Sequence, residues 1–365
     1  MTETGVLLKR LPQMSGISIS AALVISIIGL SLSIDVLLGI NAKLTVLLPI
    51  FIGFVGVFVL GYAILPILKQ LKIGQIIRED GPQSHLSKTG TPTMGGIFIV
   101  PVGVMLAAIW SGFHADVLAA GLLTLAFGAV GWLDDWQILV QKSNKGIAPR
   151  TKLLLLAIAA TAFCVWMGLT HSTAITAIVL PLNLVLPLGL LFWPLAMFVL
   201  LGSSNATNLT DGMDGLAAGT GAIALTGLAL LVGADHPDLS TFSACMAGSY
   251  LGFLWHNCNP AKVFMGDTGS LALGGALAAV ALLGNMLWGL AVVGAIFIWE
   301  TITVMAQVSY YKATKDPNGV GKRLFKMAPY HNHLELSGWQ ETQVVGVFYL
   351  VGLLLTLGAI ALSRI

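Results

Sequence analysis

The stretch from Asn205 to Gly219 reads NATNLTDGMDGLAAG and carries Asn208, Asp211 and Asp214 at three-residue steps. On a helical turn, residues spaced in this way share a face and point at one object. Two carboxylates and a carboxamide on one face suit a hydrated cation or a polar ligand that carries a cation. Long apolar runs flank the stretch, and polar groups are costly there, which favours a functional site. The alternative is a capped helix start with Thr210 or Asp211 as N-cap, which would account for one of the three polar residues.

A second acidic feature is the pair Asp134 and Asp135, which stands at the end of an apolar run in the sequence GWLDDW. Adjacent residues on a helix diverge by about 100°, so we do not expect the pair to bind one ion as a unit. One carboxylate could take a proton or a cation while the other orients it. Two carboxylates at a helix C-terminus oppose the macrodipole, which favours use in a site over solvation at the interface.

The third acidic feature is Asp267, in NPAKVFMGDTGS, just before a predicted helix start that Thr268 or Ser270 could cap. Its carboxylate could be a cap or a metal ligand, and the N–H groups behind it could receive phosphate oxygens. Asn257 and Phe264 are candidates for binding and stacking a nucleobase. Taken alone, Phe264 would be interpreted as a core residue.

Two further loops could recognise phosphate. Residues 78–96 are rich in glycine and carry Lys88 and Thr93, a combination that suits phosphate, although no Walker A pattern is present and a plain turn is an equal alternative. The loop PYHNHLE places His331 and His333 two residues apart, so in an extended chain they face the same way. Phosphate recognition suits this pair better than zinc, because the carboxylates elsewhere prefer a hard cation.

Glu300 and Gln307 lie seven residues apart inside one apolar run, and therefore on one helical face. Such residues within a membrane segment either join helices or line a site, and the sequence leaves both interpretations open.

The composition places these residues in a membrane protein. Of the 365 residues 9% are charged and 56% hydrophobic, and the mean hydropathy is +0.90; soluble domains have about 25% charged residues. Long apolar runs predict an all-α, polytopic integral membrane protein and not a β-barrel, whose strands are short and alternating. A net charge of +2 gives no support for binding nucleic acid, and the three cysteines have the setting of small core residues.

Each predicted span is close to the roughly 20 residues that a crossing needs. We expect eleven: 17–38, 44–68, 94–112, 116–134, 152–170, 187–205, 215–234, 241–257, 269–285, 287–311 and 343–363. Residues 171–186 are expected to form a surface turn or short hairpin, and the first span a retained anchor. If the spans alternate, 16 of the 18 Lys and Arg residues lie on one side. That side is then cytoplasmic by the positive-inside rule, and every polar cluster falls on it. A cytosol-facing enzyme is therefore favoured over an ion-coupled transporter, whose polar groups would lie at the midplane.

The motifs KTGTPTMGG, LDDW, NLTDGMDG, NPAKVFMGDTGS and PYHNHLE together resemble the phospho-N-acetylmuramoyl-pentapeptide-transferases, within the polyprenyl-phosphate N-acetylhexosamine-1-phosphate transferases. The resemblance runs from about residue 74 to the C-terminus. It implies ten transmembrane helices, which we place in residues 44–365. The span 17–38, in an extension of residues 1–43, is additional to them. It also implies a bacterial inner (plasma) membrane location with the site at the cytoplasmic face, and suggests a homodimer.

The same resemblance implies a reaction and its residues. UDP-MurNAc-pentapeptide would pass its phospho-sugar to undecaprenyl phosphate, giving lipid I and UMP, with Mg²⁺ as cofactor and membrane lipid around the chain. Asp267 matches the Mg²⁺-associated aspartate, and Asp134 and Asp135 the aspartate pair of the catalytic set. The positions that match the family's substrate-binding residues are Lys88, Thr93, Asn208, Asp211, Asp214, Asn257, Phe264, Gln307, His331 and His333.

Two positions depart from the family pattern, and two questions stay open. Asn332 replaces the middle histidine of a triplet, and Ile138 stands where a lysine is common. Either Asp134 or Asp135 deprotonates the acceptor for direct attack, or Asp267 attacks first and forms a covalent intermediate. A sister activity, transfer of GlcNAc-1-phosphate to the same lipid, is the close functional alternative.

Overall fold

The computed structural model describes residues 14–37, 46–70, 88, 90–141 and 146–363. The predicted domain boundary at 43/44 and most of the loop 78–96 lie outside the described residues. So do several of the counted basic residues, namely Lys9, Arg10, Lys43, Lys72, Arg78, Lys142, Lys145 and Arg364.

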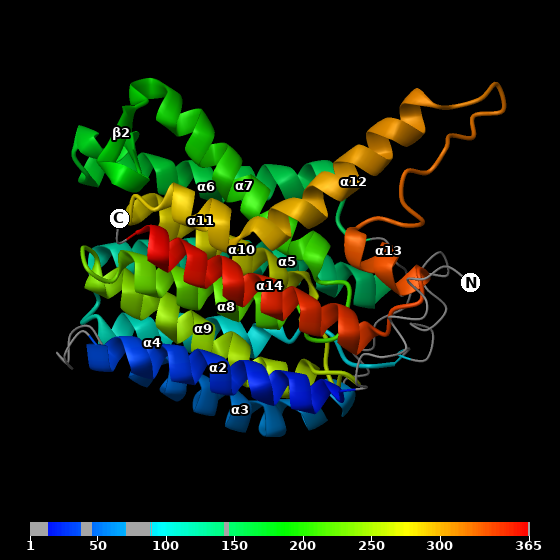
Figure 1. Ribbon diagram of the computed structural model, residues 1–365, viewed down its shortest axis with the longest axis horizontal. Helices are drawn as coiled ribbons and strands as arrows, with labels where there is room; N and C mark the ends of the chain where they lie inside the picture. Colours follow the sequence, from blue (N-terminus) through cyan, green and yellow to red (C-terminus); the bar gives the residue numbers. More distant parts are fainter. Residues whose placement is uncertain (1–13, 38–45, 71–87, 89, 142–145, 364–365) are drawn as a thin grey trace.

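The chain forms a bundle of helices that run side by side (Figure 1). Its helices are α2 (Gly16–Leu37), α3 (Leu47–Gln70), α4 (Gly96–Trp110), α5 (Ala115–Gln141), α6 (Pro149–Thr170), α7 (Phe192–Thr210), α8 (Leu216–Val232), α9 (Pro237–Asn257), α10 (Gly266–Leu283), α11 (Leu287–Val293), α12 (Ala295–Ala313), α13 (Tyr330–Leu336) and α14 (Glu341–Leu362). The prediction of an all-α polytopic membrane fold is confirmed, including a helix ahead of the ten expected from the resemblance.

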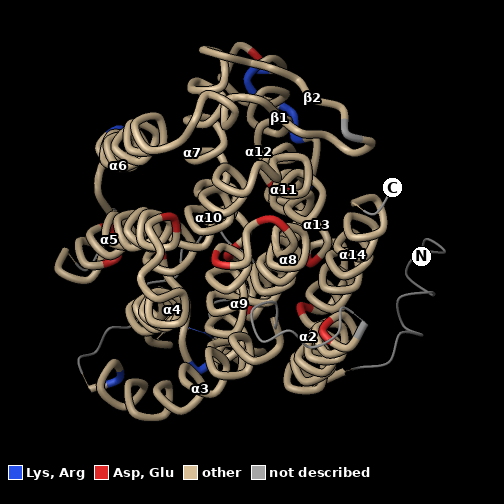
Figure 2. The backbone as a smooth tube through the Cα atoms, turned by 90° about the vertical axis from the view of Figure 1, so that its left-hand side faces the viewer, with Lys and Arg blue, Asp and Glu red and all other residues tan. Residues whose placement is uncertain are grey.

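Helices α8, α9 and α10 occupy the middle of the bundle, as the view along the helices shows (Figure 2). Their sequences are rich in Gly, Ala, Ser and Thr, and nearly all of their residues are buried. Small side chains let helix backbones approach closely, which is how helices associate when the solvent is as apolar as their side chains. The core is therefore built on backbone proximity, and it brings the ends of α7, α8 and α10 together.

The outer helices present apolar side chains to their surroundings. Large exposed hydrophobic residues lie on α3, α6 and α14, among them Phe51, Val59, Leu154, Ile158 and Leu354. Within the described part of the chain, seven helices are long and apolar enough to cross a membrane, or eight if α11 and α12 form one bent span. Such a surface is expected of a multi-pass membrane protein and not of a soluble one.

Three predicted spans differ from the structure. Helices α4 and α8 are apolar but have only 15 and 17 residues, shorter than the expected crossings. The span 287–311 is not one straight helix, because α11 and α12 are bent by 72° at a break around Gly294. The bend directs α12 away from the bundle (Figure 1).

The connector before α7 forms the short hairpin that the sequence predicts. Strands β1 (Ala177–Leu180) and β2 (Leu184–Pro187) pair antiparallel, with Ala177 opposite Pro187. Leu182 takes a positive φ of 65° in the turn. The cysteine prediction is also confirmed, because Cys164, Cys245 and Cys258 are buried and free.

The crossing of α3 and α9 gives a stability prediction with a control in the same helix. A Cβ on Gly53 would lie 2.7 Å from the Cys245 carbonyl oxygen, whereas a Cβ on Gly56 would meet only Val102 Cγ1 at 3.6 Å. Gly53→Ala is expected to lower the free energy of unfolding by about 1–3 kcal/mol through overpacking. Gly56→Ala shares the gain in helix propensity and should stay close to wild type. Thermal unfolding in detergent measures both, and equal melting temperatures would contradict this account of the crossing.

Candidate active site

The turn between α7 and α8 carries the central polar residues, but not on one helical face. Asn208 lies in the last turn of α7, Asp211 follows the helix end at Thr210, and Asp214 lies in the turn before α8. Gly215, with a φ of +81°, precedes the first residue of α8. The expectation of one shared helical face is therefore wrong, because α7 ends at Thr210, before both aspartates. The alternative, Thr210 or Asp211 as N-cap of the next helix, is not observed either, because Gly215 holds that position.

Asp135 caps the start of α10 from a different helix. Its Oδ1 accepts a hydrogen bond from the Asp267 backbone N–H at 3.1 Å, and its Oδ2 accepts from the Thr268 N–H at 3.0 Å and the Thr268 hydroxyl at 2.6 Å. A negative charge at a helix N-terminus satisfies free N–H groups and favours the macrodipole. The prediction that Thr268 or Ser270 caps this helix is wrong, because the cap comes from α5.

Asp134 and Asp135 lie inside α5, which continues to Gln141. The expectation that they end a helix is therefore wrong, and the macrodipole argument built on it does not apply. Their divergence around the helix is confirmed by their contacts. Asp134 Oδ1 accepts from the Ile147 N–H at 2.9 Å, whereas Asp135 accepts from the backbone at the start of α10.

Lys152, in the first turn of α6, binds the carboxylate of Asp267. Its ammonium contacts Asp267 Oδ2 and lies 3.7 Å from Asp134 Oδ2. On the other side of Asp267, the Asn208 amide donates to Oδ1 at 2.8 Å and to the Ser270 hydroxyl at 2.9 Å. In the sequence Lys152 is one of the 16 Lys and Arg residues assigned to one side of the membrane, and no motif distinguishes it from the others. A lysine at a helix N-terminus opposes the macrodipole, and that placement was the missed signal.

We call Asp134, Asp135, Asp211 and Asp267 the aspartate cluster. Burial, together with repulsion from Asp267, Asp135 and Asp214, raises the pKa of Asp211 to about 8. Asp267, Asp134 and Asp135 surround one ammonium group, that of Lys152, so a further positive charge would be stabilised here.

A second group forms around Lys88. Its ammonium lies 2.8 Å from Asp214 Oδ1 and 2.6 Å from Glu341 Oε1. Burial opposes the charge of Lys88, but Glu341 and Asp214 outweigh it and raise the pKa of the lysine. Asn259 donates to both carboxylates, at 3.1 Å to Asp214 and 3.0 Å to Glu341. Glu341 begins α14, and no motif in the sequence indicates its role.

Asn257, Thr93 and Phe264 lie on the segments that frame the turn. The Asn257 amide group is buried and joins Gly215 N–H, at 3.0 Å, to the Val263 carbonyl, at 2.9 Å. The Phe264 backbone pairs with Pro92 and Gly95, on either side of the buried Thr93. The structure thus brings these three predicted residues to one place, with Asn257 engaged in holding the turn.

His331 points at the same turn from α13. Its Nδ1 lies 2.8 Å from Glu300 Oε2, and both side chains are buried. A Cβ on Gly212 would lie 2.3 Å from His331 Nε2, so the ring packs directly on the turn. Of the two interpretations of Glu300, the helix-joining contact is the one present, with His331 as partner.

His333 does not face the same way as His331, because both lie on helix α13 and not in an extended chain. Its Nδ1 accepts from the Lys326 N–H at 3.1 Å, and its ring contacts Phe325 and Tyr330. Gln307 binds the same segment through Oε1, which accepts from the N–H groups of residues 324 and 325 at 2.9 Å each. These two predicted residues therefore hold residues 324–326.

With this geometry in place, comparison with known proteins assigns the family. Residues 117–285, which include the whole aspartate cluster, match Glycosyl transferase family 4. A phospho-N-acetylmuramoyl-pentapeptide-transferase of Gloeothece citriformis is 61% identical over 306 residues, 84% of each chain. One from Nostoc punctiforme is 61% identical over 314 residues, 86% of each chain, and one from Picosynechococcus 52% over 345 residues, 94% of each. The chain belongs to the phospho-N-acetylmuramoyl-pentapeptide-transferase family.

Membership of this family implies Mg²⁺, and the donor set can be tested for it. Among the described residues, no three His, Cys, Asp or Glu side chains lie close enough to form a complete ion site. Mg²⁺ does not need one, because it is usually bound by one or two carboxylates together with water and substrate phosphates. Asp267 and Asp134 already face a cationic group, the Lys152 ammonium, and Asp135 and Asp211 lie close enough to Asp267 to repel it. The residues fit the ion.

The buried pair of Glu300 and His331 gives a prediction for the family fold. Glu300→Ala leaves His331 Nδ1 buried without its acceptor and is expected to lower the free energy of unfolding by about 1–3 kcal/mol. Thr301→Ala is the control, since the Thr301 hydroxyl donates only to Phe297 in its own helix, and it should stay within about 0.5 kcal/mol of wild type. Thermal unfolding in detergent compares them. If the two variants melted together, the pair would not be a stabilising contact.

Proposed function

We propose that this chain transfers phospho-MurNAc-pentapeptide from UDP-MurNAc-pentapeptide to undecaprenyl phosphate, releasing UMP and giving lipid I. The observation that carries the proposal is the position of Asp267, held between Lys152 and Asn208 inside an excess of carboxylates. The names of the relatives support the same reaction.

The charges of the site suit a pyrophosphate substrate. An oxygen of undecaprenyl phosphate attacks the sugar-bearing phosphorus, the bond from that phosphorus to the bridging oxygen breaks, and UMP leaves with that oxygen. Negative charge grows on the leaving group, and fixed cationic groups stabilise it. Lys152 and Lys88 are the ammonium groups in contact with the predicted site aspartates. We assign Lys152 to the reacting phosphates and Lys88 to the nucleotide.

The contacts of the aspartate pair support different roles for its members. Asp135 accepts three hydrogen bonds from the start of α10, so we assign it to positioning Asp267. Asp134 is oriented by the Ile147 N–H beside Lys152, and we assign it the proton of the acceptor phosphate. Mg²⁺ held by Asp267 would add positive charge at the pyrophosphate.

We further propose that the site faces the cytoplasm, in the plasma membrane of a bacterium. Lys69, Arg150, Lys152 and Lys312 lie at helix ends on the side of the site, whereas the described connections 111–114, 171–191, 233–236 and 284–286 contain no Lys or Arg. By the positive-inside rule, the side with the Lys and Arg residues is the cytoplasmic side. There a soluble nucleotide and a lipid-anchored acceptor could meet. The proposal includes a homodimer, which rests on the family resemblance.

The reaction is tested with the purified full chain, Mg²⁺, undecaprenyl phosphate and either UDP-MurNAc-pentapeptide or UDP-GlcNAc. We expect UMP and a lipid-linked product with the first nucleotide only; product with UDP-GlcNAc alone would assign the sister activity. Ion flux in sealed vesicles without UMP would assign a transporter. Without acceptor we expect no UMP, and stoichiometric release would overturn direct attack.

Lys152→Met should lower kcat about 100-fold, and the exposed Lys315→Met should not change it.

Removal of the metal gives a separate prediction. Treatment with a chelator should abolish turnover, and added Mg²⁺ should restore it, because the cluster is left with uncompensated carboxylates. The turnover of Asp267→Asn should stay at least about 100-fold below that of wild type at every Mg²⁺ concentration. Full activity of the wild-type chain in excess chelator would contradict the assignment of Mg²⁺.

A further inference from the structure

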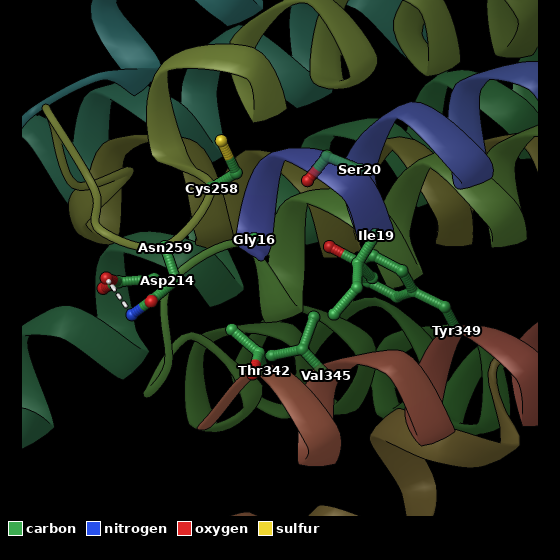
Figure 3. Close-up of a pocket in the computed structure, with 9 residues that line it drawn as sticks. All are labelled: Gly16, Ile19, Ser20, Asp214, Cys258, Asn259, Thr342, Val345 and Tyr349. Atoms are coloured by element: carbon green, nitrogen blue, oxygen red, sulfur yellow. Dashed lines mark hydrogen bonds between the residues drawn. The ribbon is translucent and has the colours of Figure 1, made fainter. Parts of the chain in front are cut away.

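The first helix, α2, begins against the loop that follows α9. A Cβ on Gly16, the first residue of α2, would lie 2.2 Å from the Asn259 carbonyl oxygen and 2.7 Å from its nitrogen. Figure 3 shows Gly16 at the end of α2, close to Asn259. The obstacle is backbone on the other side, so a side chain could be accommodated only if a helix or a loop moved. Glycine is what allows this approach.

The same residue, Asn259, holds the site on its other side. Its amide donates to Asp214 Oδ2 at 3.1 Å and to Glu341 Oε2 at 3.0 Å, and the Ala261 N–H donates to Asp214 Oδ2 at 3.0 Å. Asp214 and Glu341 in turn bind Lys88. A single short loop therefore rests on α2 through its backbone and orients two carboxylates through its donors.

Helix α14 supports the same turn from the neighbouring side. The Tyr349 hydroxyl donates to the Gly215 carbonyl at 2.7 Å, and Ile19 of α2 packs 3.7 Å from where a Cβ on Gly346 would lie. Gly16, Asp214, Asn259 and Tyr349 line one small pocket between α2, α14 and the turn (Figure 3). The start of α2 is thus packed into the wall of the site and is more than a membrane anchor.

We propose that α2 is a positioning element of the active site: the Gly16–Asn259 contact sets Asp214 and, through it, Lys88. This inference rests on the proposed function, in which Lys88 binds the nucleotide substrate. Gly16 and Asn259 are positioning residues, because they act through Asp214 and Lys88 and not on the substrate. Moving the loop should then weaken nucleotide binding while leaving the aspartate cluster and the lipid acceptor unaffected.

The test is a matched pair of substitutions in one helix, Gly16→Ala and Gly29→Ala, in the full chain. A Cβ on Gly29 would meet no atom within 4 Å, so this control makes the same substitution in the same helix without the steric clash. We expect Gly16→Ala to raise KM for UDP-MurNAc-pentapeptide about 10-fold, with kcat and the KM for undecaprenyl phosphate within about twofold of wild type, as misplaced binding groups do. Gly29→Ala should match wild type in all three.

A second variant tests whether the effect passes through Asn259. Asn259→Ala should raise the same KM, and the double variant should be no worse than the more impaired single variant, because both remove one contact path. Multiplied effects, or a Gly16→Ala enzyme with unchanged nucleotide KM, would overturn the proposal. A general loss of kcat with both KM values unchanged would assign a merely structural role to the helix and overturn it as well.

Hydrogen exchange gives a readout that does not depend on the reaction. Gly16→Ala should speed exchange in peptides 211–216 and 258–263 relative to Gly29→Ala, because the N–H groups of Asp214, Gly215 and Ala261 are bonded within this unit. Unchanged exchange would also overturn the proposal. A wild-type chain that makes no UMP would refute the proposed function alone, and the exchange comparison would still decide whether α2 positions the turn.

Discussion

The carboxylate of Asp267 is the interaction on which the site depends. It lies at the start of α10, where Asp135 of α5 caps the helix, Lys152 of α6 contacts one oxygen and Asn208 of α7 binds the other. Four helices therefore meet at one charged group. An unpaired carboxylate at the edge of an apolar bundle is costly, so Lys152 and Asn208 stabilise the Asp267 charge, while Asp135 holds the start of the helix that carries it.

Close helix packing makes that meeting possible. Where α10 passes α4 and α5, a Cβ on Gly96 would lie 2.2 Å from the Gly269 nitrogen, and one on Gly131 would lie 2.1 Å from the Asp267 carbonyl oxygen. Larger residues at these crossings would separate α5 from α10 and carry Asp135 away from the N–H groups that it caps. The glycines at these crossings thus keep the helices close enough for the hydrogen bonds of the site to form, since a hydrogen bond is lost within about 1 Å of displacement.

The turn between α7 and α8 is the second meeting point. Lys88, Asn257, Asn259, His331, Glu341 and Tyr349 all contact residues 212–215 or the side chain of Asp214. Gly212 leaves room for the His331 ring, and Gly215 adopts a positive φ that a residue with a side chain would rarely adopt. In the proposed reaction the turn connects the nucleotide side of the site to the aspartate cluster, because Asn208 and Asp211 lie at one end of it and Asp214 at the other.

The sequence by itself determined the membrane class, the family resemblance, the connecting hairpin and the set of acidic, amide and imidazole residues. Those properties are local, because hydropathy and motif spacing are read within about 20 residues. Only the tertiary structure decided which groups are partners. Lys152 binds Asp267, 115 positions away in the sequence, and Lys88 binds Glu341, 253 positions away. Neither pair can therefore be recognised from the spacing of residues within one motif. The same limit explains the misplaced cap of α10 and the opposed histidines of α13, since a helix boundary is set by the contacts around it as much as by its own residues.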